Sequence, residues 1–477
     1  MATPAGANHQ SRLEFAEQII PIVGSLYREN GVVSHVHGRR LINLSAQGVV
    51  KAHRFARHAG GEELDPALTL EFLTAVKAAN PGPASLDVGA AIAAWRSTGS
   101  STSLVEAAQS VISPVAGQGR APQESDCADV VLYGFGRIGR LLARILLNLS
   151  ENGRGPRLRA IVVREGGAND LVKRASLLRR DSVHGPFAGT ITVDAERNLI
   201  IANDQPIQVI YANDPASIDY TAYGITDAIV VDNTGRWRDE AGLSLHLQST
   251  GVKKVLLTAP GKSPLKNIVY GINHDTIADD DTIVTAASCT TNAITPVLKV
   301  LNDQYGIQYG HVETVHSYTN DQNLIDNFHK GDRRGRSAAL NMVLTETGAA
   351  KAVSKALPEL EGRLTGNSIR VPTPDVSMAI LNLTFDKEVD RESLNNHLRD
   401  ASLFSRLRKQ IDYIESPEVV STDFLGSDRA GIVDGLATIT SGNHAVVYVW
   451  YDNEYGYSHQ VVRIVEQLAG THPPRLP

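Results

Sequence analysis

The stretch that most constrains the fold runs from residue 128 to 142, where an apolar segment leads into a G-x-G-x-x-G spacing and an amphipathic segment. The glycines are Gly134, Gly136 and Gly139. In a dinucleotide-binding unit the first permits a tight turn, the second lets a pyrophosphate approach the backbone, and the third allows close helix–strand packing. The spacing alone is a weak signal, but its strand–helix context predicts a Rossmann-type domain. A doubly wound domain without a nucleotide is the alternative.

A second apolar segment, residues 158–163, ends at Arg164 and Glu165. An acidic residue near the end of this strand hydrogen-bonds the ribose 2′-hydroxyl of NAD, so Glu165 favours NAD. Arg164 is suited to a 2′-phosphate, and NADP therefore remains open as the cofactor.

A candidate nucleophile, Cys289, lies between Ser288 and Thr290. The apolar run 282–286 predicts a buried strand and residues 293–301 predict a helix, which places Cys289 at a strand-to-helix turn. Free backbone N–H groups and the positive end of a helix lower the pKa of a thiol and favour the thiolate. The polar neighbours argue against the alternative of a buried structural cysteine.

The segment 312–319 predicts a strand that carries His316. A histidine elsewhere in the chain is the usual partner of a catalytic cysteine, because it pairs with the thiolate and moves protons. A purely structural role for His316 is the alternative at this point.

Composition limits the function classes. The 477 residues are enough for two to four domains, and the net charge of −6 gives no global basic field for nucleic acid. Two cysteines imply no disulfide framework and fit a reducing compartment. We find no signal peptide and no apolar run near the roughly 18 residues of a membrane helix, so we expect a cytoplasmic protein without a membrane partner.

Residues 1–113 predict a mainly helical extension of unknown role, with residues 1–10 disordered. Asp65 followed by Pro66 is typical of a helix start. Residues 31–60 contain no acidic residue but several basic ones, which indicates a solvated face or, alternatively, an anionic or protein partner. The Gly/Pro-rich residues 114–126 predict a linker.

From about 129 to 470 the chain resembles the phosphorylating glyceraldehyde-3-phosphate dehydrogenase family. The resemblance rests on Ser288-Cys289-Thr290-Thr291-Asn292, on His316-Ser317-Tyr318-Thr319, and on the segments 133–140, 181–185, 347–351, 370–377 and 450–458. It implies an α/β fold: a Rossmann-type NAD(P)-binding domain over 127–288, completed by a C-terminal helix over 458–470, and an α+β catalytic domain with an antiparallel sheet over 289–457. It also implies a homotetramer.

The resemblance implies a chemistry as well. Cys289 attacks the aldehyde of glyceraldehyde 3-phosphate, His316 acts as the base, and inorganic phosphate releases the acyl group from a thioester as 1,3-bisphosphoglycerate. By position in the family, the phosphate-binding residues are Ser288, Thr290, Thr319, Thr347, Gly348, Arg370 and Arg336, and the cofactor-binding residues are Gly134, Gly136, Arg137, Ile138, Gly139, Glu165, Thr258 and Asn453. No metal site is implied.

The chain departs from the family at several positions. Asp321 stands where many members have a substrate-binding threonine, and Asn327-Phe328 replaces the Leu-Pro pair of NAD-specific members. Two other functions remain as alternatives: oxidation of erythrose 4-phosphate, and a dehydrogenase-fold protein whose N-terminal region mainly binds a partner or regulates.

Overall fold

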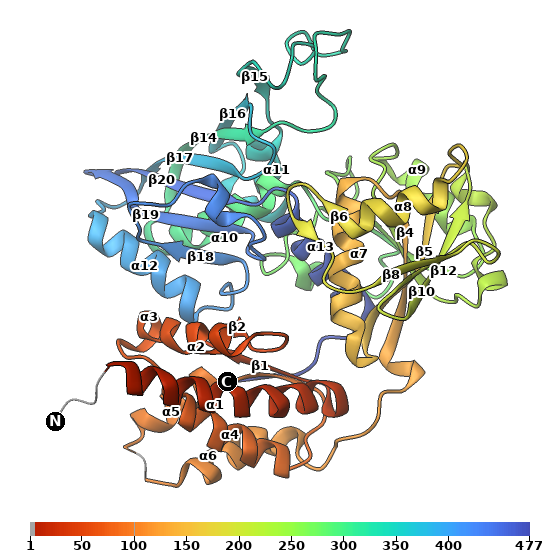
Figure 1. Cartoon of the computed structure of the whole chain (residues 1–477). Coiled ribbons are helices and arrows are strands. Elements are labelled where there is room, and N and C mark those ends of the chain that lie inside the picture. Colours follow the sequence, from red (N-terminus) through yellow and green to blue (C-terminus); the bar gives the residue numbers. More distant parts are fainter. Residues whose placement is uncertain (1–4, 100) are drawn as a thin grey trace. The chain divides into compact units, whose positions relative to one another are not determined.

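The computed structural model describes residues 5–99 and 101–477. The chain divides into two compact units (Figure 1). The N-terminal unit comprises Met1–Cys127, Leu149–Gly155 and Thr471–Pro477, and the main unit comprises Ala128–Asn148 and Pro156–Gly470. None of the helices in the described part of the chain is both long and apolar enough to cross a membrane.

The N-terminal unit contains the predicted helices. The Asp65 side chain accepts a hydrogen bond from the Ala67 N–H at 3.0 Å, so the predicted helix start is confirmed. The predicted disorder is wrong for residues 5–10, which begin the first helix, while residues 1–4 lie outside the described residues. The helices are α1 (Ala5–Ser25), α2 (Ala46–Phe55), α3 (Arg57–Gly60), α4 (Pro66–Ala78), α5 (Val88–Ser97) and α6 (Leu104–Ile112).

A four-stranded sheet in the same unit was not predicted. Its order is β2 (Arg39–Arg40), β1 (Val32–Val36), β3 (Ala84–Asp87) and β21 (Arg475–Leu476). The last strand comes from the C-terminus and runs parallel to β3. The Ser85 N–H donates to the Pro474 carbonyl at 2.8 Å, and Leu476 is buried in the core of the unit. Both ends of the chain therefore build one hydrophobic core.

The first sheet of the main unit confirms the predicted Rossmann-type architecture. Its core pairs are parallel, and an antiparallel hairpin extends one edge. The eight strands, in spatial order, are β13 (Ile283–Thr285), β12 (Val252–Leu257), β11 (Ala228–Asp232), β4 (Cys127–Tyr133), β5 (Gly155–Val163), β10 (Gln205–Tyr211), β9 (Leu199–Ala202) and β8 (Ile191–Asp194). The helices are α7 (Arg137–Leu149), α8 (Asp170–Arg179), α9 (Glu240–Leu243) and the C-terminal α13 (Tyr455–Ala469).

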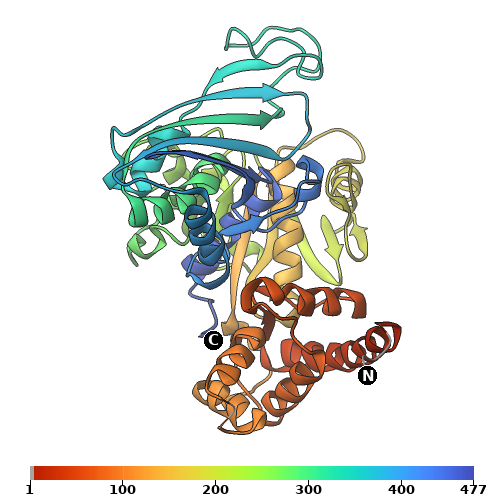
Figure 2. The ribbon, with the colours of Figure 1, turned by 90° about the vertical axis from the view of Figure 1, so that its left-hand side faces the viewer.

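The second sheet of the main unit is mostly antiparallel, with parallel pairs between β14 and β16 and between β18 and β19. The helices α10 (Cys289–Tyr305) and α12 (Arg391–Phe404) cover one face, and their apolar side chains form a common core with the sheet (Figure 2). The strand order is β15 (Val343–Glu346), β16 (Leu364–Val371), β14 (Ile307–Ser317), β17 (Ser377–Phe385), β20 (His444–Tyr451), β19 (Gly431–Ser441) and β18 (Ile411–Ile414). A further helix, α11 (Ala349–Ala356), precedes β16.

Leu476→Ala should destabilise the N-terminal unit by about 2 kcal/mol, because truncating a buried leucine removes apolar contacts and leaves a cavity. The measurement is thermal unfolding of the full chain, together with amide hydrogen exchange at Ser85 and Asp87, which donate to the C-terminal strand. The control is Leu177→Ala, since that side chain is 51% exposed. Equal protection of both amides in the two variants would contradict the role of β21.

Candidate functional site

A cavity of about 970 Å³ opens at the carboxyl ends of β4, β5 and β11. Gly134, Gly136 and Glu165 line it, together with Arg164 and Trp237. This is the edge of a parallel sheet at which ligands bind in open α/β folds. The cavity therefore gathers the predicted glycine turn and the predicted ribose-binding residue.

The glycines have the properties that the sequence pattern requires. Gly134 has a φ of 96°, which side-chain-bearing residues rarely adopt. A Cβ atom on Gly139 would lie 2.6 Å from the Gly134 carbonyl oxygen, so α7 packs against the turn only because Gly139 has no side chain. These residues fit a dinucleotide.

The remaining predicted cofactor residues do not line this cavity. Arg137 and Ile138 begin α7, and Arg137 forms ion pairs with Asp181 and Glu454. The Thr258 N–H donates to the Asp232 carbonyl at 3.0 Å, directly after β12. The Asn453 side chain is buried and accepts a hydrogen bond from the Ser377 hydroxyl at 2.6 Å.

The predicted nucleophile and base lie together. Ser288 caps α10, because its hydroxyl oxygen accepts the Thr291 N–H at 3.0 Å, and Cys289 is the first residue of that helix. His316 lies next to the end of β14. The Cys289 Sγ atom is 3.6 Å from His316 Nε2, within reach of a sulfur hydrogen bond.

Both ring nitrogens of His316 have close neighbours. Its Nδ1 atom lies 2.7 Å from the Ser317 carbonyl oxygen, which accepts, and 3.0 Å from Arg370 Nη1, which donates. Its Nε2 atom faces the thiol. Burial, followed by the positive charge of Arg370, lowers the pKa of His316 to about 3. His316 is therefore a neutral base near pH 7.

The expectation that the helix end lowers the thiol pKa is wrong in this structure. Burial is the largest contribution and raises the pKa of Cys289, while Arg370 and hydrogen bonds from Thr290 oppose part of that rise. The resting thiol and imidazole are thus both neutral. The proton passes to His316 as the sulfur attacks, when opposite charges form together.

A cluster of charged and polar side chains adjoins this pair. The Arg370 Nη1 atom donates to the Ser317 carbonyl at 3.0 Å and to the Thr319 hydroxyl at 3.2 Å. Asp321 accepts a hydrogen bond from Arg334 Nη1 at 2.9 Å and one from the Thr319 hydroxyl. Two guanidinium groups and a hydroxyl suit a phosphate.

Three predicted phosphate ligands are engaged elsewhere. The Ser288 hydroxyl caps α10, and the buried Thr290 hydroxyl lies 2.9 Å from the hydroxyl of Tyr451. The Arg336 side chain is 66% exposed and binds Asp326 at 2.8 Å. The structure thus brings Arg334, and not the predicted Arg336, into the cluster.

Thr347 and Gly348 immediately precede α11, and Gly348 is its N-cap residue. The Thr347 hydroxyl accepts the Ala349 N–H at 3.2 Å, and Gly348 is exposed with nothing near the position of a Cβ atom. This N-terminus is open to an anion. The sequence predicted one arginine of the segment 333–336 and named Arg336, whereas the structure brings Arg334 into the cluster. It did not name Tyr451, although that residue lies in a segment that carried the resemblance.

Comparison with known proteins agrees with this geometry. The family model "Glyceraldehyde 3-phosphate dehydrogenase, NAD binding domain" matches residues 128–240, and the corresponding C-terminal domain model matches residues 288–453. A glyceraldehyde-3-phosphate dehydrogenase-like protein of Pseudomonas aeruginosa strain UCBPP-PA14 is 61% identical over 461 residues, which cover 96% of this chain and 100% of that protein.

Two relatives match only the dehydrogenase part. Glyceraldehyde-3-phosphate dehydrogenase of Zymomonas mobilis is 40% identical over 344 residues, covering 72% of this chain and 98% of that protein. Glyceraldehyde-3-phosphate dehydrogenase 1 of Bacillus cereus is 42% identical over 339 residues, which cover 71% of this chain and 97% of that protein. The Pseudomonas protein shares the N-terminal extension as well, because its alignment spans nearly the whole chain.

Arg370→Met should raise the pKa of the Cys289 thiol, because it removes the positive charge that favours the thiolate. We expect alkylation by iodoacetamide at pH 7 to slow about tenfold, the effect of a rise of one pKa unit. The measurement is the pH dependence of the alkylation rate, with Cys127→Ser in the background so that only Cys289 reacts. Arg336→Met is the matched control, and an equal slowing in that variant would contradict the role of Arg370.

Proposed function

The chain belongs to the glyceraldehyde-3-phosphate dehydrogenase family, whose members are NAD-dependent oxidoreductases, and we propose that it interconverts glyceraldehyde 3-phosphate and 1,3-bisphosphoglycerate. The forward reaction consumes inorganic phosphate and NAD and yields NADH. The 3.6 Å approach of Cys289 Sγ to His316 Nε2 carries this proposal, because it joins a nucleophile to a base. The neighbouring cluster of Arg370 and Arg334 supports a phosphorylated substrate.

The chain's own residues supply most of the chemistry. The Cys289 sulfur bonds to the aldehyde carbon as its proton passes to His316, and the product is a thiohemiacetal. The first N–H groups of α10 stabilise the oxyanion that forms on the substrate. NAD, when bound, supplies the hydride acceptor that turns the thiohemiacetal into a thioester.

Phosphate then attacks the thioester carbon and the Cys289 sulfur leaves as the thiolate, which recovers its proton from His316. Arg370 and Thr319 hold phosphate groups in this proposal, and Thr347 with Gly348 offers the second anion position at the start of α11. Arg334 takes the role that the sequence assigned to Arg336. Glu165 and the glycine turn hold the dinucleotide, and the acidic side chain favours NAD.

Purified protein should reduce NAD in the presence of glyceraldehyde 3-phosphate and phosphate, followed as absorbance at 340 nm. Cys289→Ser should lose essentially all of this activity, because a hydroxyl is a far weaker nucleophile than a thiol. Cys127→Ser is the matched control. Near-normal turnover of Cys289→Ser would overturn the mechanism, and faster reduction with NADP or with erythrose 4-phosphate would overturn the cofactor or substrate assignment.

We also propose a homotetramer, supported by an apolar surface on one loop of the main unit. The segment between β14 and β15 extends from the sheet in Figure 1 and exposes large apolar side chains. Surfaces of this kind mark protein–protein contacts. The exposed apolar side chains of this segment include Leu324 (75% exposed), Ile325 (76%), Phe328 (93%), Leu340 (82%) and Met342 (76%).

Leu324→Asp combined with Phe328→Asp should shift the protein towards smaller species, because burying two carboxylates in an interface costs free energy. The measurement is light scattering coupled to size exclusion. Leu177→Asp, on an exposed position of α8, controls for the added charge. A double variant with the mass of the wild type would contradict this interface.

A further inference from the structure

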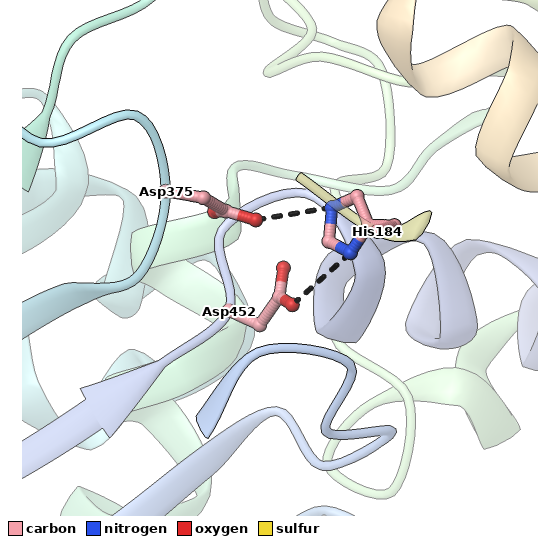
Figure 3. Close-up of side chains that lie close together, drawn as sticks. All are labelled: His184, Asp375 and Asp452. Carbon is pink, nitrogen blue, oxygen red and sulfur yellow. Dashed lines mark ion pairs between the residues drawn. The ribbon is translucent and has the colours of Figure 1, made fainter. Parts of the chain in front are cut away.

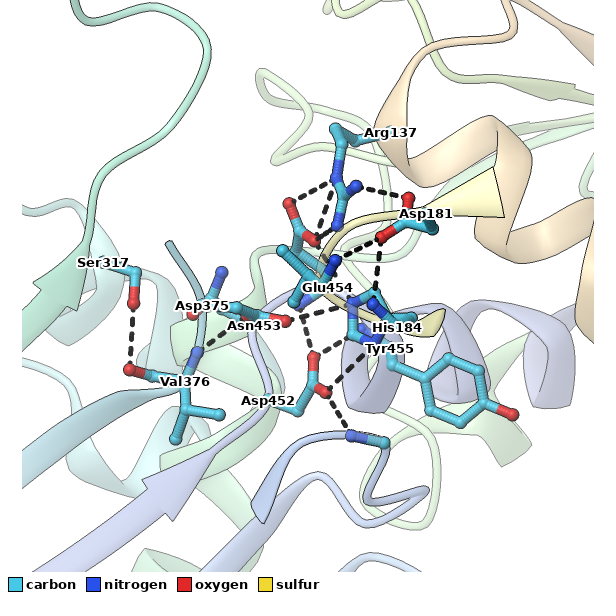
Figure 4. A network of polar contacts seen from close by, with 12 residues as sticks. Arg137, Asp181, His184, Ser317, Asp375, Val376, Asp452, Asn453, Glu454 and Tyr455 are labelled. Atoms are coloured by element: carbon cyan, nitrogen blue, oxygen red, sulfur yellow. Dashed lines mark hydrogen bonds and ion pairs between the residues drawn. The ribbon is translucent and has the colours of Figure 1, made fainter. Parts of the chain in front are cut away.

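Six ionisable side chains meet in the main unit, and none of them takes part in the proposed chemical steps (Figures 3 and 4). They come from the start of α7, the hairpin of β6 (Arg180–Asp181) and β7 (Gly185–Pro186), the loop after β16, and the turn before α13. His184 lies at the centre with 4% of its side chain exposed. The other five are Arg137, Asp181, Asp375, Asp452 and Glu454.

Carboxylates face both nitrogens of the His184 ring. Nε2 lies 3.1 Å from Asp375 and 3.3 Å from Glu454, and Nδ1 lies 3.9 Å from Asp452. Three carboxylates therefore lie within ion-pair distance of one buried imidazole ring, and opposite charges this close favour its protonated form.

The charge balance points the same way. Four carboxyl groups share this buried region with Arg137, so a neutral His184 would leave one guanidinium as the single cation among the six side chains. Burial alone lowers the pKa of His184, but hydrogen bonds to Asp375 and Glu454 and the charge of Asp452 outweigh it and raise this pKa to about 9. Burial and the nearby charge of Asp375 raise the pKa of Asp452, and backbone hydrogen bonds, including one of 2.6 Å from the Tyr455 N–H, oppose part of that rise.

His184 thereby joins segments that carry three proposed site residues. Asp452 and Glu454 flank Asn453 in the chain, and Glu454 also binds Arg137. Asp375 lies in the loop that follows Arg370. The hydroxyl of Ser377, the first residue of β17 after this loop, donates to Asn453 at 2.6 Å and links the two segments directly.

We propose that His184, as an imidazolium, is a positioning residue that holds Asn453 and Arg137 for dinucleotide binding. This rests on the proposed function for the cofactor, NAD, and on the family resemblance for the assignment of those two residues to it. The imidazolium neutralises Asp375 and Asp452 and takes part of the charge of Glu454. When its proton is lost, the buried carboxylates repel one another and the turn that carries Asn453 loses its anchor.

The test is NAD binding to the full chain by calorimetry, which requires no turnover. His184→Gln keeps a polar side chain of similar size but cannot be charged, and we expect the Kd for NAD to rise about tenfold, equivalent to about 1.4 kcal/mol. The KM for NAD should rise in parallel, while the KM for the aldehyde stays within about twofold. His444→Gln is the matched control, because that exposed ring contacts Thr384 away from this cluster.

The pH dependence separates positioning from a merely structural effect. The folded pKa of His184 is raised above its usual value near 6.5. The contribution of the charged His184 to NAD binding is therefore complete below about pH 6.5 and is lost as the pH rises through about 9. The wild-type Kd for NAD should rise across this range, the Kd of His184→Gln should stay flat, and Asp375→Asn should move the midpoint to lower pH by removing one carboxylate.

Several results would overturn the proposal. In calorimetry, these are an unchanged Kd for NAD in His184→Gln or a pH transition near 9 that persists in this variant. Nitrogen-15 NMR shifts that show a neutral His184 ring at pH 7.5 would also contradict it. So would a divalent ion that the wild type binds and His184→Gln does not. Asp375→Asn supplies the same pH test if His184→Gln does not fold. A wild-type protein that binds NAD but does not oxidise the aldehyde would instead overturn the proposed function.

Discussion

The parallel pairing of β14 with β16 sets the geometry on which the site depends. Its register places His316 opposite Arg370 on adjacent strands, so the guanidinium reaches the imidazole, the Ser317 carbonyl and the Thr319 hydroxyl together. Side chains alternate between the two faces of a strand. A slip of one residue would therefore send Arg370 to the opposite face and separate the proposed anion site from the base.

Burial decides the protonation states at the catalytic pair. The end of a helix favours an anion by roughly 0.3–1 kcal/mol at exposed positions, whereas removing a lone charge from water costs several kcal/mol. The sequence placed Cys289 at a strand-to-helix turn but could not show how deeply the thiol would lie. The sequence therefore predicted a lowered pKa for the Cys289 thiol, whereas burial raises it. Sequence and structure agree that Cys289 and His316 lie together.

Local patterns predicted the local features of the fold well. The glycine turn and the Asp65 cap depend on neighbouring residues, and the structure contains both. The helix predicted over 293–301 is also present, but it begins four residues earlier, at Cys289. The strand pair β3 and β21 depends on residues nearly 400 positions apart, and β21 has only two residues, so no periodicity could reveal it.

The choice between two arginines failed for a similar reason. Arg334 and Arg336 lie in one short polar loop, and the direction of each side chain is set by its partner, Asp321 or Asp326. Residue type is the same at both positions, so only the three-dimensional path of the loop distinguishes them. The same limit applied to His184: its segment contributed to the family resemblance, but its three carboxylate partners come from distant parts of the chain.

The cluster around His184 bears on how Arg137 can bind a dinucleotide. Arg137 already forms ion pairs with Asp181 and Glu454, so a pyrophosphate has to compete with these carboxylates for the same guanidinium. Glu454, however, is shared with His184, and a carboxylate that is satisfied by a second cation holds the first one less strongly. A protonated His184 thus lowers the cost of turning Arg137 towards the cofactor, while its bonds to Asp375 and Glu454 keep the surrounding segments in place.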